Sequence, residues 1–235
     1  MAAKPRKKSR PTRATPATRS RRTSRPARGA PRARDPVATK RRILDAATKE
    51  FARLGLGGAR VDAIATRAKA NKRMIYHYFG NKNRLFLAVL ESAYGAIRTA
   101  EQALDLQHLE PETALRTLTE FTWQYYLAHP EFLTLVNSEN LHKARHLKQS
   151  RIVGEMFSTL VTMVRNILDR GVRDGVFRKG IDPVQLNITI AAIGYYYLTN
   201  RFTGSIIYER ELMAPKALKQ RLAFNVETIM RLVRK

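Results

Sequence analysis

The side chains between residues 71 and 86 combine positive charge with hydrogen-bonding rings. Read at helical spacing, Ile75 and Phe79 share one face, and the other face is cationic and aromatic. That second face consists of Lys72, Arg73, Tyr76 and His77. Arginine and lysine donate hydrogen bonds to guanine O6 and N7 or to phosphates, and the DNA major groove is wide enough for an α-helix. The pattern therefore fits a helix that reads DNA, and equally a surface helix anchored by its aromatic residues.

Two helices are predicted before this stretch. Asp35-Pro36 has the form of an N-cap followed by proline at the first helical position. The first helix should bury residues three and four positions apart, and Gly55 should end it in the left-handed conformation. Those positions are Ile43, Leu44, Ala47, Phe51 and Leu54. A second short helix carries Val61, Ile64, Ala65 and Ala68, and residues 69–71 form a turn. Two short helices joined by such a turn, the second cationic, form a helix-turn-helix pattern.

The charge distribution indicates a polyanionic partner. The chain has a formal net charge of +25, and residues 1–36 carry 13 Lys and Arg against one acidic residue. Residues 37–104 carry 13 against 5, and residues 105–235 carry 18 against 13, so the excess falls along the chain. Residues 1–36 hold six of the ten prolines and are predicted to be a disordered basic arm that binds phosphates without sequence preference. The alternative is a solubilising leader.

Composition excludes several other classes. The absence of cysteine rules out disulfides, thiolate catalysis and Cys-type zinc sites, and it suits a reducing cytoplasm. The longest apolar run, residues 188–198, is too short to span a bilayer, so we expect no membrane partner. No apolar secretory segment follows the basic N-terminus, so we expect no export. No glycine-rich phosphate loop or convincing Ser-His-Asp set is present, which argues against an enzyme. We expect a cytoplasmic, nucleoid-associated protein without a cofactor.

The remainder of the chain reads as helical throughout. A long helix is expected from Asn81, with apolar residues at helical period through Ile97. Prolines and glycines then divide the sequence into helices near 111–128, 131–146, 150–174, 182–202 and 215–234. No segment alternates with period two for long enough to form a strand, so the predicted fold class is all-α.

Residues 41–89 resemble the DNA-binding domain of TetR-family (tetracycline-repressor-like) transcriptional regulators. The resemblance is strongest in Ile75-Tyr76-His77-Tyr78-Phe79, followed by Asn81-Lys82 and Leu85. Val61-x-x-Ile64-Ala65 and the first-helix run from Ile43 to Gly55 also match, and residues 130–147 resemble a ligand-domain pattern of one subgroup. The resemblance implies a three-helix helix-turn-helix domain over residues 37–84. It also implies a helical ligand-binding and dimerisation domain over residues 85–235.

The resemblance also implies roles for individual side chains on double-stranded DNA. Lys72, Arg73, Tyr76 and His77 would face base edges, whereas Arg60, Tyr78 and Lys82 would hold the backbone. Lys40, Arg41 and Arg42 would clamp phosphates or reach a minor groove; a merely solvated cationic face is the alternative. Two positions depart from the family pattern. Lys69 stands where glycine is common in the turn, and Arg60 replaces a hydroxyl residue before the second helix.

The family resemblance implies that the second half binds an effector and a second copy of the chain. Its candidate pocket residues supply aromatic walls with polar groups, although core packing is the alternative for each one. They are Trp123, Tyr126, His129, Phe157, Met163, Tyr195, Tyr196 and Tyr197. Two helices are too apolar for a single buried face, which indicates a homodimer. The residues concerned are Ile188, Ile190, Ala191, Ala192, Ile193, Gly194, Leu222, Phe224, Val226, Ile229 and Leu232.

Glu139, His142 and His146 have spacings that could bind a metal, but the surrounding cations favour a solvated or phosphate-binding surface, and we predict no metal site.

The preferred function is a sequence-specific repressor released from its operator by an unknown small molecule. An architectural nucleic-acid binder acting through its basic arm is the alternative.

Overall fold

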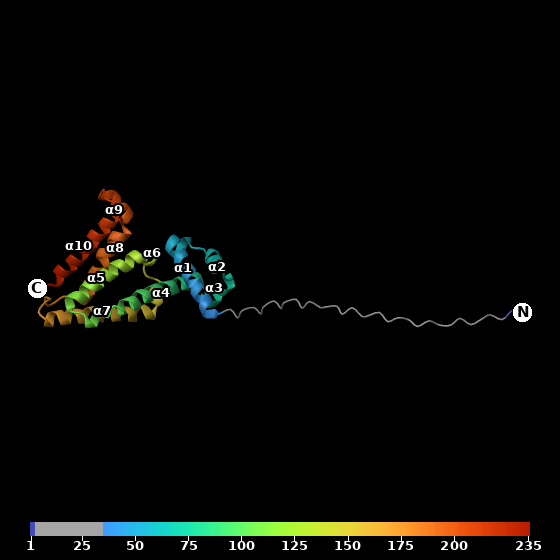
Figure 1. Cartoon of the computed structure of the whole chain (residues 1–235), viewed down its shortest axis with the longest axis horizontal. Helices are drawn as coiled ribbons and strands as arrows, with labels where there is room; N and C mark the ends of the chain where they lie inside the picture. The colour runs from blue at the N-terminus through green and yellow to red at the C-terminus, as the bar shows by residue number, and fades with distance from the viewer. Residues whose placement is uncertain (3–34) are drawn as a thin grey trace. The chain divides into compact units, whose positions relative to one another are not determined.

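The computed structural model describes residues 1–2 and 35–235, and the predicted disorder of the arm falls on residues 3–34, outside that range (Figure 1). The first part of the described chain consists of α1 (Pro36–Gly58), α2 (Val61–Ala68), α3 (Lys72–Phe79) and α4 (Lys82–Gln102). Next come η1 (Leu106–His108), α5 (Pro111–Ala128), α6 (Pro130–Leu141) and η2 (Leu147–Gln149). The last elements are α7 (Arg151–Arg173), α8 (Pro183–Thr199), α9 (Arg201–Ile207) and α10 (Pro215–Val233). The all-α prediction is confirmed.

Local capping accounts for where several helices begin. The Asp35 carboxylate accepts hydrogen bonds from the backbone N–H groups of Val37 and Ala38, and Pro36 occupies the first position of α1, as predicted. Pro111, Pro130, Pro183 and Pro215 likewise begin α5, α6, α8 and α10. Proline suits this position because the first N–H groups of a helix have no partner within it.

Two predicted helices are shorter than expected. The helix predicted over 131–146 ends at Leu141, after which Lys143 and Ala144 both adopt a φ of 56° and η2 follows. The helix predicted over 182–202 ends at Thr199, and a separate α9 follows Asn200. The Tyr196 carbonyl near the end of α8 accepts hydrogen bonds from both the Asn200 backbone N–H, at 3.1 Å, and the Asn200 side-chain amide, at 2.9 Å.

Gly55 bends the first helix instead of ending it. Its backbone has φ 65° and ψ 178°, an extended mirror conformation and not the predicted left-handed cap. The bend exposes Leu54, which is 39% accessible, and buries Leu56, whose N–H donates to Ser138 Oγ at 3.4 Å. The prediction that Leu54 is buried is therefore wrong. Leu56 takes its place and contacts α6.

Three hydrophobic clusters form the core of residues 35–235. The first joins α1, α2, α3 and α4, and it also contains Leu135 from α6, which is fully buried. The second lies among α5, α7, α8 and α10, and the third joins Ile97 of α4 to Trp123, Phe132 and Leu198. In Figure 1, α1, α2 and α3 lie at one end of α4, whereas α8, α9 and α10 lie on the opposite side of the helical body. Both α4 and α6 therefore connect the first cluster to the rest of the chain.

Candidate DNA interface and effector cavity

The turn between α2 and α3 is built around a left-handed lysine. Lys69 has φ 49° and ψ 42°, and its N–H donates to the carbonyls of Ala65 and Thr66. The sequence departure at this position thus carries the backbone cost that glycine would avoid. Asn71 caps α3 by accepting a hydrogen bond from the Arg73 N–H at 2.8 Å. Within residues 35–235 the Arg60 side chain makes no capping bond to α2, in agreement with the loss of a hydroxyl there.

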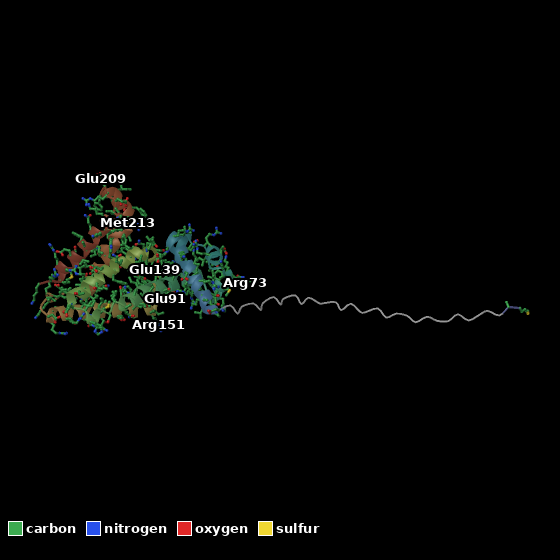
Figure 2. All side chains as sticks on the ribbon, in the orientation of Figure 1. Arg73, Glu91, Glu139, Arg151, Glu209 and Met213 are labelled. Atoms are coloured by element: carbon green, nitrogen blue, oxygen red, sulfur yellow. The ribbon has the colours of Figure 1, made fainter. Side chains whose placement is uncertain are left out.

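The two faces of α3 separate as its sequence indicates. Ile75 and Phe79 are buried in the first cluster, whereas Lys72, Arg73 and His77 are exposed and Tyr76 is 43% accessible. Figure 2 labels Arg73 at the edge of the helix-turn-helix end of the molecule. Tyr78 is half-buried, and its ring packs edge-on against His77 with centroids 5.3 Å apart. The exposed face therefore presents cations and rings to solvent.

Several predicted DNA-contacting cations also stabilise the helix-turn-helix unit, which consists of α1, α2, α3 and the start of α4. Lys72 Nζ lies 2.8 Å from an Asp62 carboxylate oxygen on α2, and this hydrogen-bonded partner lowers the pKa of Asp62. Lys82 Nζ donates to the Gly57 carbonyl at 3.3 Å. Arg42 donates to Thr39 Oγ1 at 3.0 Å and to the Ala68 carbonyl at 3.4 Å.

The other predicted DNA contacts lie on the same unit. The Lys40 ammonium stands 5.8 Å from the centroid of the Phe79 ring, and Arg41 and Arg60 are exposed. The assignment of each cation to a base or a phosphate stays a prediction.

A cavity of about 540 Å³ lies among α4, α5, α6, α7 and α8, and we call it the α4–α8 cavity. Three predicted pocket residues line it: Tyr126, Phe157 and Tyr195. This volume is within the range of small-molecule sites. The polar part of its wall was not predicted from the sequence. Thr122, Asn140 and Asn187 contribute to that wall, together with the ion pair Arg98–Glu101.

The remaining pocket candidates lie elsewhere. Tyr196 and Tyr197 line a cavity of about 420 Å³ between α8, α9 and α10. Met163 lines a cavity beside η1 and α7. Trp123 is buried, and its ring lies edge-on to Tyr197 at 5.6 Å. His129 lies 4.3 Å from Tyr125 by ring centroids, and its Nδ1 lies 3.2 Å from Glu131 Oε1. The predicted residues thus belong to several sites and do not form one pocket.

Arg98 and Glu101 form the charged part of the α4–α8 cavity. Arg98 Nη1 lies 2.9 Å from Glu101 Oε2, and their side chains are 13% and 4% accessible. Burial raises the pKa of Glu101 to about 7, although the nearby guanidinium opposes this shift. A signal for this pair was present in the sequence. Arg98 and Glu101 follow Tyr94 at helical spacing, so two charged residues occupy the buried stripe of α4.

Glu139 and His146 correct another prediction. Both were expected on a solvated surface, yet each side chain is almost fully buried. Glu139 Oε2 lies 2.6 Å from His146 Nδ1, and Glu139 Oε1 accepts hydrogen bonds from the backbone N–H groups of His146 and Leu147. The end of α6 and the turn after it supply these donors, which is why helical spacing alone did not predict the pair. Figure 2 labels Glu139 within the body of the protein.

A cationic helix-turn-helix joined to a helical body that encloses a ligand-sized cavity defines a DNA-binding regulator. The family model described as "Bacterial regulatory proteins, tetR family" matches residues 43–89. The model described as "Tetracyclin repressor-like, C-terminal domain" matches residues 111–229. The chain belongs to the TetR family of transcriptional regulators, whose role is not enzymatic.

Two named repressors are similar to this chain in sequence, and one solved structure is similar in fold. The HTH-type transcriptional repressor NicS of Pseudomonas putida is 38% identical over 204 residues, covering 87% of this chain and 96% of that protein. The HTH-type transcriptional repressor SCO4008 of Streptomyces coelicolor is 39% identical over 141 residues, covering 60% of this chain and 70% of that protein. FadR of Bacillus subtilis, solved in complex with stearoyl-CoA, shares the fold with a TM-score of 0.60 at 17% identity. That match covers 81% of this chain and 97% of FadR.

Proposed function

We propose that this protein is a sequence-specific transcriptional repressor that leaves its operator when a small molecule binds the α4–α8 cavity. Relatives named as repressors support the first part, and a related fold solved with an acyl-CoA ligand supports the second. One observation carries the coupling between them. α4 and α6 both line the cavity, and both contribute buried residues to the cluster that supports α3.

The connection gives a physical route from ligand to DNA. Phe86 of α4 packs edge-on against Phe51 of α1 at 5.1 Å and against His146 at 5.2 Å. Closer to the cavity, Tyr94 of α4 contacts Phe132 of α6 at 5.4 Å. A ligand that separates Tyr94 from Phe132 therefore changes the angle between α4 and α6, the two helices that support the helix-turn-helix. It shifts the equilibrium only by its differential affinity for the two arrangements.

The working form is proposed to be a homodimer. Ile190, Val226 and Ile229 from the predicted dimer set are buried within the chain, whereas Ile188 and Phe224 are 52% and 61% accessible. The neighbouring α9 adds Phe202, Ile206 and Ile207, which are 72%, 79% and 70% accessible. A second copy covering this apolar surface would allow the two α3 helices to meet major grooves about 34–36 Å apart, or a multiple of that spacing.

Sedimentation of the full chain tests the dimer. The variant Phe224→Glu should sediment as a monomer at micromolar concentration, because a carboxylate would lose its solvation in the interface. Leu141→Glu is the matched control, since Leu141 is 84% accessible at the end of α6 and should leave the dimer intact. A Phe224→Glu protein that stays dimeric would place the interface elsewhere.

Footprinting on DNA flanking the chain's own gene tests the function. A discrete protected site with two inverted half-sites is expected, and Arg73→Ala should abolish its protection at concentrations where the unchanged chain protects it fully. Coverage of DNA without register would contradict the proposal and favour an architectural binder. We expect the protein to act in the cytoplasm, on nucleoid DNA. The division into residues 1–36, 37–84 and 85–235 stays part of this proposal.

A further inference from the structure

The α4–α8 cavity contains a buried guanidinium with an unused donor. Arg98 Nε is buried and finds no hydrogen-bond acceptor among the residues that the structure describes, and the buried Nη1 has only the ion-pair contact with Glu101 Oε2 at 2.9 Å. Glu101 lies at ion-pair distance from Nη1 but does not satisfy Nε. A buried donor without an acceptor is costly in a folded protein. An acceptor supplied by a ligand would remove that cost.

The walls around Arg98 are flat and aromatic. Tyr126 and Phe132 are stacked at 17° with centroids 5.9 Å apart, and Phe157 lies edge-on to Tyr94 at 5.5 Å. The Arg98 guanidinium carbon itself stands 5.5 Å from the Phe157 ring centroid. Such walls favour a planar apolar group over a branched or strongly hydrated one.

We propose that this cavity recognises a planar organic acid, whose carboxylate accepts hydrogen bonds from Arg98 while its ring lies between the aromatic walls. The inference rests on the proposed function, because it names the ligand class of the same effector site. Arginine presents donors in a planar fork that matches a carboxylate. An aromatic enclosure alone would also suit a cation, but a cation here would stand against the Arg98 guanidinium. The free Arg98 donor therefore favours an anionic ligand over a cationic one.

Protonation of Glu101 adjusts the strength of this recognition. At a pH below about 7 the Glu101 carboxyl is protonated in the protein, and it then competes less for Arg98. Above that pH its negative charge opposes an anionic ligand, so acid affinity should fall as the pH rises through 7. The other titratable or charged groups around the pair are Tyr94, Tyr125, Tyr126, Tyr195 and, beside an adjoining cavity, Glu155. Burial raises the pKa of the four phenols, which stay neutral over this range.

Calorimetric titration of the full chain, without DNA, tests the ligand class with two matched series. The probes are benzoate, benzamide and benzamidinium, and 2-naphthoate with its amide and amidinium. In each series the acid should bind at least tenfold more tightly than the amide, and the amidinium should bind most weakly. Arg98→Gln should abolish the preference for the acid. Glu101→Gln should keep that preference and flatten its dependence on pH between 6 and 8.

The outcomes are distinguishable from failure of the proposed function. An amide or amidinium that binds as tightly as its acid overturns the inference, as does a lack of measurable binding by both acids at millimolar concentration. A preference for acids that survives in folded Arg98→Gln also overturns it. If Arg98→Gln does not fold, Arg98→Lys and the comparison of acids with amides on the unchanged chain still decide. A footprint on operator DNA persists in all these cases if the chain is a DNA-binding repressor of another ligand class.

Discussion

Some side chains of the helix-turn-helix unit both stabilise its fold and supply charge for DNA binding. Lys72 and Lys82 are tied to Asp62 and Gly57, so each one stabilises the unit as well as supplying charge. Tyr76 extends from α3 with 43% of its surface accessible. A side chain that projects from α3 can read a base edge, whereas Lys82, held at the Gly57 carbonyl outside α3, is better placed to contact a phosphate. Substitutions at Tyr76 and Lys82 should therefore differ in kind.

Tyr76→Ala should weaken binding to the operator more than binding to random DNA, because it removes a group that reads bases. Lys82→Ala should weaken both nearly equally and reduce the salt slope by about one, because it removes a phosphate contact. Fluorescence anisotropy on the two DNAs at several salt concentrations measures this. Lys219→Ala, an exposed lysine on α10, is the control and should change neither affinity. Matching losses on both DNAs for the two variants would contradict the division of roles.

Glu101 gives a pH dependence of stability. Its pKa in the folded protein is about 7 against 4.5 as the reference, so between these values the folded state holds a proton that the unfolded state has lost. Stability should therefore fall as the pH rises from about 4.5 to 7, by up to about 3 kcal/mol, and then level off for this group. In thermal melts at pH 5 and pH 8, Glu101→Gln should gain stability relative to the unchanged chain at the higher pH. A difference that is constant with pH would argue against a raised pKa.

At the scale of elements, α6 is a second connection between the effector cavity and the helix-turn-helix. α4 is the continuous helix that leads from the turn after α3 into the cavity wall, and the sequence predicted a long helix from Asn81. α6 reaches the first cluster through Leu135 and through the Ser138–Leu56 contact. Its end is fixed by the buried Glu139–His146 pair, which also packs on Phe86. A bound ligand can thus change the position of the helix-turn-helix through both α4 and α6.

Glu139→Ala should lower the free energy of unfolding by about 3 kcal/mol, because it leaves buried N–H donors and an imidazole without their acceptor. Glu131→Ala on the same helix is the matched control. Its carboxylate also pairs with a histidine, His129, but both side chains are more than a third accessible, so about 0.5 kcal/mol or less is expected. Denaturant unfolding of the two variants measures the difference. Equal losses would mean that the Glu139 pair does not stabilise the α6 end.

At the scale of the whole molecule, positive charge is concentrated toward the N-terminus. Residues 1–36 alone carry a formal charge of +12, which exceeds that of either later segment. None of the helices in residues 35–235 is long and apolar enough to cross a membrane. We interpret this dense charge as a contribution to DNA affinity through phosphate contacts, because phosphates attract clustered lysine and arginine.

Deleting residues 1–34 should flatten the dependence of DNA affinity on salt by several units, since each neutralised phosphate contributes about −0.9 to the slope. The ratio of operator to random-DNA affinity should change little, because phosphate contacts carry no sequence information. Binding isotherms on both DNAs over a range of salt concentrations test this. An unchanged slope, or a collapse of the specificity ratio, would show that the arm acts in another way.

The sequence by itself determined the helix-turn-helix and the all-α class, because these depend on local signals. The spacing of Ile75 and Phe79, the cap at Asp35 and the turn over residues 69–71 all act within a few residues. Only the tertiary structure decided which residues share a cavity and which polar groups are buried. Tyr126 and Tyr195 come together with Arg98 because α4, α5 and α8 all line one cavity, whereas the adjacent Tyr196 lines another. Glu139 is buried because the turn after α6 folds His146 back onto it, a contact that helical periodicity does not encode.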